Sequence, residues 1–513
     1  MSSSDTSPIS LPTAAHVSSP VRFRFDNTYA RLPEYFYSRL APTPVAAPQL
    51  VKLNVELAHY LGLDLETLAG PPGIEILAGN KVAEGSEPLA LAYAGHQFGH
   101  FVPRLGDGRA NLLGEVVARD GMRYDIQLKG SGPTPFSRGG DGRATLGPVL
   151  REYILSEAMA ELGVPTTRAL AAVTTGERVL RETPLPGAVL TRVAASHLRV
   201  GSFQYFAARR DTEGIRTLTD YAISRHYPEA AQANQPYRAF LDAVIARQAR
   251  LIAHWMLIGF VHGVMNTDNT AISGETIDYG PCAFMEAYHP DTVFSSIDAN
   301  GRYAYGNQPR IALWNLTRLA EALLPILEHE AGGDEEGLLS AKEALNKFSP
   351  QFDAAHSFGM LRKIGLATER PGDASLVEDL LECMASNRAD FTLTFRRLCD
   401  AAASPGGDEG VRMLFDAPGA YDAWATAWRQ RLEEEPKSKD DRAAAMRAMN
   451  PAFIPRNHLV EEALEAAVRR QDFRPFEELL DVVSRPWEDR PGLERYATPA
   501  RPDEMVTRTF CGT

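Results

Sequence analysis

Alternating hydrophobic and polar residues predict a strand-rich first half of the chain. In Tyr124–Lys129, Ile126 and Leu128 fall on one face of an extended strand, while Gln127 and Lys129 fall on the other. Similar patterns beside glycine-rich turns predict further strands within residues 105–117, 169–174 and 188–193.

Apolar residues at helical spacing predict helices, most of them in the second half. Two come early, Leu50–Leu61 and Pro148–Leu162, and a glycine that suits a helix end follows each. A long helical run is expected over Tyr237–His262, before a charged stretch at 433–441 that is expected to be a solvated linker. The other predicted helices are Ile311–Leu324, Leu338–Phe348, Leu376–Asp390, Phe391–Ala402, Ala420–Leu432 and His458–Gln471.

The stretch from His262 to Gly280 carries the densest candidate chemistry. The β-branched runs 270–272 and 276–277 flank Ser273-Gly274-Glu275, which predicts a hairpin. Such a hairpin would bring Asn269 and Asp278 together, with Asp268 beside them. Amide and carboxylate oxygens that converge in this way suit Mg²⁺. The alternative is an ordinary turn rich in Asn, Asp and Gly.

Part of this stretch matches a kinase pattern. Asp278-Tyr-Gly resembles the Asp-Phe-Gly element, and Asn269 aligns with the asparagine that ends the catalytic loop. This alignment places Val264 where kinases have their catalytic aspartate. Because valine cannot accept a proton, the protein is either an inactive kinase or uses another group, and Asp268 is the nearest candidate.

Two glycine-rich turns are candidate phosphate-binding elements. Gly106 and Gly108 allow backbone amides to approach a ligand, and Arg109 adds a forked cation. The same Gly-Asp-Gly-Arg tetrapeptide recurs with Asp141 and Gly142. A plain hairpin turn is the alternative for each motif alone.

Charged residues on the neighbouring elements extend this set. Lys129 ends a predicted strand and Glu152 lies beside the apolar stripe of a predicted helix, so the two could form the kinase-type pair that holds phosphates. An ordinary surface pair is the alternative. Arg192 and Arg199 are candidates for a second basic clamp.

The order of these elements predicts an α+β, protein-kinase-like fold of two lobes. We expect a tail without stable structure over residues 1–20, a strand-rich N-lobe over 21–200, a catalytic C-lobe over 201–330 and a helical extension over 331–513.

Composition and charge exclude several classes of protein. The chain has 513 residues, 44% of them hydrophobic, as in ordinary globular proteins. Its net charge of −13 disfavours nonspecific binding to nucleic acid or to anionic membranes. No apolar run approaches the roughly 20 residues of a transmembrane helix. We expect a cytoplasmic protein and a monomer.

Histidine and cysteine spacing indicates no metal cluster. His96 and His100 have no acidic helper, so we expect them to pack rather than to bind a metal. Cys383 and Cys399 lie in apolar helical contexts and are expected to be core thiols. Cys511 is the third residue from the end, and an exposed terminal thiol there is a candidate redox residue.

A series of longer motifs runs from about residue 25 to the C-terminus. They are Gly95-His-Gln-Phe-Gly99, Gly106-Asp-Gly-Arg109, Leu128-Lys-Gly130, Asp141-Gly-Arg143, Pro165-Thr-Thr-Arg-Ala169, Arg192-Val, Ser196-His-Leu-Arg199, His262-Gly-Val-Met-Asn-Thr-Asp-Asn269, Thr276-Ile-Asp-Tyr-Gly-Pro281, Asn307-Gln-Pro309 and Met449-Asn-Pro451. With these motifs the chain resembles the selenoprotein O family, pseudokinases that act as protein adenylyltransferases.

The resemblance implies a specific reaction. ATP would lie reversed in the cleft relative to kinases, so that AMP passes to Ser, Thr or Tyr hydroxyls of proteins and pyrophosphate leaves. By resemblance, Asp268 is the general base, which explains Val264, and Asn269 and Asp278 hold Mg²⁺, with Mn²⁺ as a substitute. The implied ATP-binding residues are Gly106, Gly108, Arg109, Lys129, Asp141, Gly142, Arg192, Arg199 and Asp278, with Glu152 orienting Lys129 and Cys511 matching the family's terminal selenocysteine or cysteine.

Two other functions stay open at this point. The first is a phosphotransferase for proteins or small molecules that uses Asp268 as its base. The second is a nucleotide-binding pseudokinase that works as a scaffold.

Overall fold

The computed structural model describes residues 23–510. The tail predicted over residues 1–20 and the candidate redox residue Cys511 lie outside the described residues. Within residues 23–510, none of the helices combines the length and the apolar character that crossing a membrane requires.

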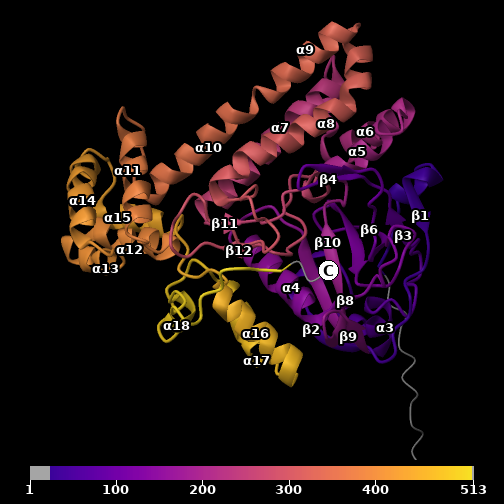
Figure 1. Ribbon diagram of the computed structural model, residues 1–513, viewed down its shortest axis with the longest axis horizontal. Coiled ribbons are helices and arrows are strands. Elements are labelled where there is room, and N and C mark those ends of the chain that lie inside the picture. The colour runs from indigo at the N-terminus through magenta and orange to yellow at the C-terminus, as the bar shows by residue number, and fades with distance from the viewer. Residues whose placement is uncertain (1–22, 511–513) are drawn as a thin grey trace, which may run out of the picture.

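An eight-stranded antiparallel sheet forms the centre of the N-terminal half (Figure 1). The strand order is β1-β3-β6-β7-β10-β9-β2, and the short β8 also pairs with β10. The strands are β1 (Tyr37–Arg39), β2 (Gln49–Leu53), β3 (Leu89–Leu91), β6 (Ala110–Val117), β7 (Arg123–Lys129), β8 (Ala144–Thr145), β9 (Arg168–Leu180) and β10 (Pro184–Ala194). The four strands expected from the sequence are therefore present, and β9 and β10 are longer than predicted.

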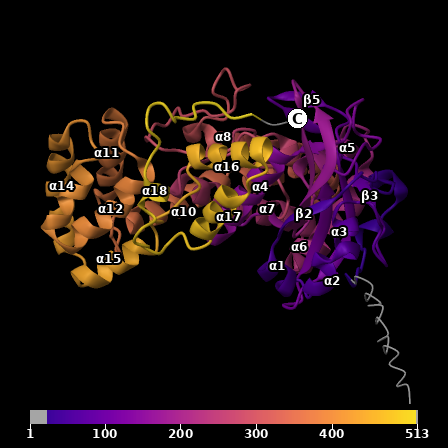
Figure 2. The same ribbon diagram turned by 90° about the horizontal axis from the view of Figure 1, so that it is seen from below.

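The two faces of the sheet pack against different helices. Ile126 and Leu128 of β7 join a core with α1 (Val55–Tyr60), α2 (Leu65–Ala69) and α3 (Pro71–Leu77). The opposite face packs on α4 (Leu146–Glu161), which is itself covered by α16 (Asn457–Arg470) and α17 (Arg474–Val483) (Figure 2). The alternation predicted for β7 is confirmed, since Lys129 lies on the face away from Ile126 and Leu128.

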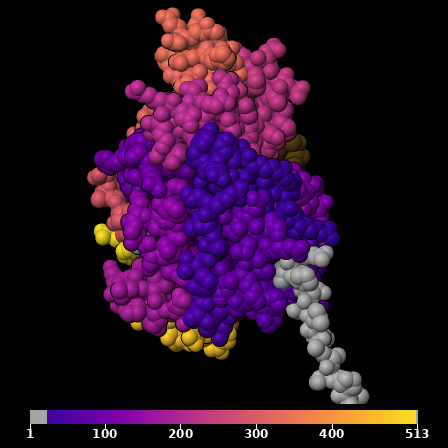
Figure 3. Space-filling model, turned by 90° about the vertical axis from the view of Figure 1, so that its right-hand side faces the viewer, coloured from indigo at the N-terminus to yellow at the C-terminus, as the bar shows by residue number. Residues whose placement is uncertain are grey.

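The second half of the chain is helical. Its first helices share one large hydrophobic core with the segments around residues 262–280. They are α5 (Val200–Ala207), α6 (Thr212–His226), α7 (Pro236–Leu257), α8 (Gln308–Ala331), α9 (Asp334–Leu345) and α10 (Phe348–Lys363). A distal group follows, with α11 (Asp373–Ser386), α12 (Phe391–Ala403), α13 (Asp408–Arg412), α14 (Pro418–Glu433) and α15 (Lys439–Arg447). The short α18 (Glu494–Ala497) contacts α16 and α17 instead, through an ion pair from Arg495 to Glu462 and a hydrogen bond from Tyr496 to Glu478. Figure 3 shows the N-terminal half as one continuous surface, beyond which the tip of the helical half projects.

Several predicted boundaries are wrong. Leu50–Leu53 belongs to β2 rather than to a helix, because it pairs with β9, and only the rest of that prediction is helical. The helix expected to reach His262 ends at Leu257, since Gly259 adopts a φ of +72° that breaks it. The helices α10, α15 and α17 lie in the extension that was expected to be helical over 331–513 but were not predicted individually, and α15 begins within the stretch expected to be a linker.

The hairpin predicted around Ser273-Gly274-Glu275 is also wrong. The chain does turn there, with the Gly274 amide bonded to the Ala271 carbonyl at 3.2 Å. The flanking residues, however, pair with other segments, Ala271 with Arg199 and Thr276 with Thr166. The stretch is therefore held by segments next to the sheet, since Arg199 follows β10 and Thr166 precedes β9.

The architecture is a mixed one, with an antiparallel sheet in the N-terminal half and helices in the C-terminal half, which confirms the α+β prediction. The finer assignment to a protein-kinase-like fold stays a prediction, as do the lobe boundaries.

Candidate active site

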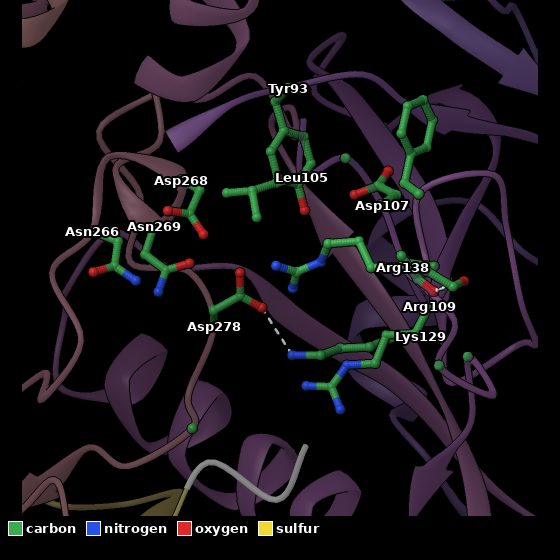
Figure 4. A pocket seen from close by; sticks show the side chains of 18 of the residues that line it. Tyr93, Leu105, Asp107, Arg109, Lys129, Arg138, Asn266, Asp268, Asn269 and Asp278 are labelled. Carbon is green, nitrogen blue, oxygen red and sulfur yellow. Dashed lines mark hydrogen bonds and ion pairs between the residues drawn. The ribbon is translucent and has the colours of Figure 1, made fainter. Parts of the chain in front are cut away.

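One cavity of about 340 Å³ lies between the sheet and the stretch from His262 to Gly280. Figure 4 shows Asp268, Asn269 and Asp278 on one side, facing Lys129 and Arg138 on the other. All residues predicted to bind ATP or metal, or to act as base, line this cavity: Gly106, Gly108, Arg109, Lys129, Asp141, Gly142, Arg192, Arg199, Asp268, Asn269 and Asp278. Glu152 lies buried behind them on α4.

Lys129 joins the two halves of the site. It ends β7, and its Nζ lies 2.6 Å from Glu152 Oε2 and 2.8 Å from Asp278 Oδ1. The strand–helix pair that the sequence suggested is therefore formed, and it is mostly shielded from solvent, unlike the surface pair that was the alternative. The lysine also contacts the aspartate of the Asp-Tyr-Gly element directly.

Two arginines complete the ionic cluster around Asp278. Arg192 NH1 lies 2.8 Å from Asp278 Oδ1, and Arg199 NH1 lies 3.0 Å from Asp278 Oδ2. Burial alone would raise the pKa of Asp278, but the charges of Lys129, Arg192 and Arg199 outweigh it and hold the pKa well below its usual range. Asp278 is therefore ionised, with a φ of +65° that is unusual for a residue with a side chain.

Two buried polar side chains, Gln127 and Asp107, hold the guanidinium groups of Arg192 and Arg199 in place. Gln127 accepts hydrogen bonds from Arg192 Nε and NH2 at 3.2 and 2.9 Å. Gln127 donates in turn to Asp107 Oδ2 at 3.2 Å, and Asp107 Oδ1 lies 3.8 Å from Arg199 NH2. The two guanidinium groups are thus fixed by side chains that the sequence-based site did not include.

Asp268 is the least compensated acid in the cavity. It is buried in the 3₁₀ turn Thr267–Asn269, and burial raises its pKa to about 6, although nearby Arg199 acts in the opposite direction. Its Oδ2 accepts a hydrogen bond from Gln97 Nε2 at 3.2 Å. Its Oδ1 accepts none from any described residue. A carboxylate with spare acceptor capacity, in a low-dielectric site, is suited to take a proton.

The neighbours of Asp268 fit a magnesium site of the kind that uses few protein ligands. Asn269 and the ionised Asp278 present oxygens to the same cavity, and Asn269 Nδ2 is held by the Val264 carbonyl at 2.9 Å. No group of three or more His, Cys, Asp or Glu among residues 23–510 is placed to hold a metal. Mg²⁺ characteristically needs only one or two carboxylates and takes phosphate oxygens and waters for the rest, so this donor set suits it.

The glycine-rich turns allow backbones to approach closely. Gly106 has a φ of +72°, and a Cβ there would lie 2.2 Å from the Phe136 ring. A Cβ on Gly142 would lie 2.1 Å from the Gly132 carbonyl carbon. Asp141 is ion-paired to Arg181 at 2.7 Å, whereas the side chains of Arg109 and Arg138 form no ion pair with any residue in the described part of the chain.

The remaining residues were missed for identifiable reasons. Gln127 shares a strand face with Lys129, and Asp107 lies inside the Gly-Asp-Gly-Arg motif, so both had a signal in the sequence. Tyr93 packs its ring under Arg199 at 4.6 Å and had none. His96 packs between Phe101 and Trp314, which agrees with the packing role expected of it.

Comparison with known proteins identifies the family. Residues 20–484 match the family described as "Protein adenylyltransferase SelO". The protein nucleotidyltransferase YdiU of Methylorubrum extorquens (strain PA1) is 65% identical over 497 residues, covering 96% of this chain and 99% of that protein. Proteins with the same name from Bradyrhizobium sp. (strain BTAi1 / ATCC BAA-1182) and Rhodopseudomonas palustris (strain BisB5) are each 63% identical over 493 residues, covering 96% of this chain and all of theirs. The chain therefore belongs to the SelO family of protein adenylyltransferases.

Proposed function

We propose that this chain transfers AMP from ATP to Ser, Thr or Tyr hydroxyls of other proteins and releases pyrophosphate. The observation that carries the proposal is the convergence of Lys129, Arg192 and Arg199 on Asp278, in a cavity that also holds Asp268. The site has three cations for a polyphosphate and a separate acid for a hydroxyl proton.

The cations match the charge that the reaction develops. Attack on the α-phosphorus breaks the bond to the bridging oxygen, so negative charge grows on the departing pyrophosphate. Lys129, Arg192 and Arg199 are now neutralised by Glu152, Asp278 and Asp107, and a polyphosphate carries enough negative charge to take the place of Asp278 as their partner. Arg109, which has no ion pair within residues 23–510, adds a cation that needs no exchange of partners.

Asn269 and Asp278 are the residues that would hold Mg²⁺. When bound, the ion supplies further neutralisation of the phosphate charge. The low pKa of Asp278 keeps its carboxylate ionised for this role throughout the neutral range.

Asp268 is proposed as the general base. Its carboxylate accepts the proton of the attacking hydroxyl while the new bond from oxygen to the α-phosphorus forms. A pKa of about 6 leaves Asp268 ionised at pH 7 and makes it a better base than an exposed aspartate. Val264 then needs no catalytic role, and a kinase-like arrangement of the lobes is part of the same proposal.

The test is labelling with ATP that carries the tag on either the α- or the γ-phosphate. The proposal predicts transfer of the α label to the chain itself and to added dephosphorylated cellular proteins, with free pyrophosphate as the second product. Transfer of the γ label would establish a phosphotransferase instead. Binding of Mg²⁺–ATP with no more labelling than Asp278→Ala shows would establish a scaffold.

A further inference from the structure

The hairpin formed by β4 (Gly95–Gln97) and β5 (His100–Val102) is attached to the catalytic loop. The His96 amide donates to Thr267 Oγ1 at 2.7 Å, and the Phe98 amide donates to Asn266 Oδ1 at 3.0 Å. These bonds hold the hairpin against the two residues that precede Asp268. The Gly-His-Gln-Phe-Gly motif of the sequence forms the first strand and the turn of this hairpin, and none of the catalytic or binding roles proposed above belongs to it.

Gln97 is the one hairpin side chain that reaches the acid. Its Nε2 donates to Asp268 Oδ2 at 3.2 Å, and Gln97 itself lines the cavity. We propose that Gln97 is a positioning residue that fixes the Asp268 carboxylate in the orientation required to receive the hydroxyl proton. This inference rests on the proposed function, because it assigns Gln97 its role through the general base.

Gly95 bounds the other oxygen of the same carboxylate. A Cβ at this position would lie 2.6 Å from Asp268 Oδ1 and 2.9 Å from Leu105 Cδ1. The hairpin backbone is therefore seated directly against the carboxylate. With Gln97 bonded to Oδ2 and Gly95 against Oδ1, the hairpin determines the plane of the carboxylate from two sides.

A nearby cation makes this control necessary. Arg199 NH1 donates to the main-chain carbonyl of Asp268 at 2.9 Å and is already paired with Asp278. A carboxylate freed from Gln97 would gain an ion pair by turning towards this guanidinium. Asp268 would then be lost as a base, and Arg199 would be less available to phosphate. Gln97 offers the carboxylate a neutral hydrogen-bond donor in place of this cation.

The hairpin itself does not depend on the Gln97 side chain. Phe98 contacts Tyr303 edge-to-face at 5.1 Å between ring centroids, and Tyr303 donates to the same Asn266 Oδ1 at 2.7 Å. Because main-chain bonds and this aromatic contact hold the hairpin, substitutions of Gln97 should leave it in place. The role of the side chain can therefore be separated from the role of the fold.

The experiment compares Gln97→Met with Gln97→Asn. Methionine matches the volume of glutamine but has no N–H, whereas asparagine keeps the amide and is shorter. In α-label transfer from ATP to the chain and to dephosphorylated cellular proteins, we expect kcat to fall about 10- to 100-fold in Gln97→Met. KM for ATP should change by less than about twofold, and Gln97→Asn should retain more activity than Gln97→Met. A purely structural role predicts the reverse order, since methionine fills the space better.

Two further variants keep the outcomes distinct. His100→Ala alters an exposed side chain of the same hairpin and should transfer as wild type does. Asp268→Asn should be inactive, and activity there would overturn the proposed base. If Asp268→Asn is inactive while Gln97→Met has the wild-type kcat, the role of Gln97 is refuted and the proposed function stands. A rise in KM for ATP alone, with kcat unchanged, would also refute the role of Gln97.

Discussion

Two lysines of this protein, one partly buried and one fully buried, have opposite surroundings. Lys129 lies in the cavity between Glu152 and Asp278, at 2.6 and 2.8 Å. Lys363, at the end of α10, is 1% exposed and lies over the rings of Phe395 and Phe391, at 4.3 and 5.5 Å, with no ion pair in the described part of the chain. Burial lowers the pKa of Lys363 to about 7.

Under the proposed function, the charge of Lys129 takes part in the reaction, whereas the charge of Lys363 is only tolerated by the fold. The charge of Lys129 is balanced by two acids. Under the proposed function, Asp278 turns to a metal ion and the lysine turns to a polyphosphate, so the partners of Lys129 are exchanged during the reaction. Lys363 faces two aromatic rings, which compensate a buried cation in part, and it can lose its proton. A buried lysine is therefore evidence of a site only where exchangeable anions surround it.

Removing the shared acid should have the largest effect. We expect Asp278→Ala to lower α-label transfer at least about 10³-fold, because the metal ligand and the partner of three cations are lost together. The variant should still unfold cooperatively, at a lower temperature, as uncompensated cations remain. Since the pKa of Asp278 is held well below its usual range, its stabilising contribution is complete at pH 7 and is lost only as the pH falls through that low value. Wild-type labelling with a native unfolding transition would refute the site.

The next-largest effect is a difference in transfer activity between the matched variants Lys129→Met and Lys363→Met. Both remove an ammonium group and keep an unbranched side chain of similar shape. We expect transfer to fall about 10²- to 10³-fold in Lys129→Met and to stay within about twofold of wild type in Lys363→Met. Steady-state labelling at saturating ATP measures both, and equal losses in the two variants would remove the distinction drawn above.

Most residues of the candidate site were predictable, because each belongs to a local motif with its own chemistry and all of these line one cavity. Lys129 and Glu152 were paired correctly since strand alternation and helical spacing each give a direction to a side chain. The supporting residues were harder: the bond between Gln97 and Asp268 joins segments 171 positions apart, which no local pattern encodes. The hairpin around Gly274 was mispredicted for the same reason, since its β-branched flanks pair with Arg199 and Thr166 rather than with each other.

The stability of Lys363→Met should show the opposite sign from that of a site variant. A folded-state pKa near 7, below the ordinary value of 10.5, means that the charged lysine destabilises the fold fully below pH 7. The penalty disappears as the pH rises towards 10.5, where the unfolded lysine is also neutral. We expect Lys363→Met to gain about 1–3 kcal/mol at pH 7, discounted for the lost aromatic contacts, and less at pH 10. Chemical denaturation at the two pH values checks this, and a gain that grows with pH would contradict it.

Restoring an acid at the kinase position should have the smallest effect. Val264 lines the cavity, and its carbonyl holds Asn269, so Val264→Asp adds a carboxylate without moving the cationic cluster. We expect γ-label transfer to stay at background, because the position of the base does not decide which phosphorus is attacked. Labelling with γ-tagged ATP tests this, with Val264→Asn as the uncharged control, and γ transfer by the aspartate variant alone would show that the base does decide.

The central claim is that this cavity moves AMP, and mass spectrometry of the modified acceptor tests it most directly. The wild-type chain is incubated with Mg²⁺, ATP and dephosphorylated cellular proteins, beside Asp278→Ala, and the acceptor peptides are fragmented. The account predicts adenylyl groups on Ser, Thr or Tyr with the wild-type chain only. Phosphoryl groups in their place, or adenylyl groups at equal levels with Asp278→Ala, would contradict it.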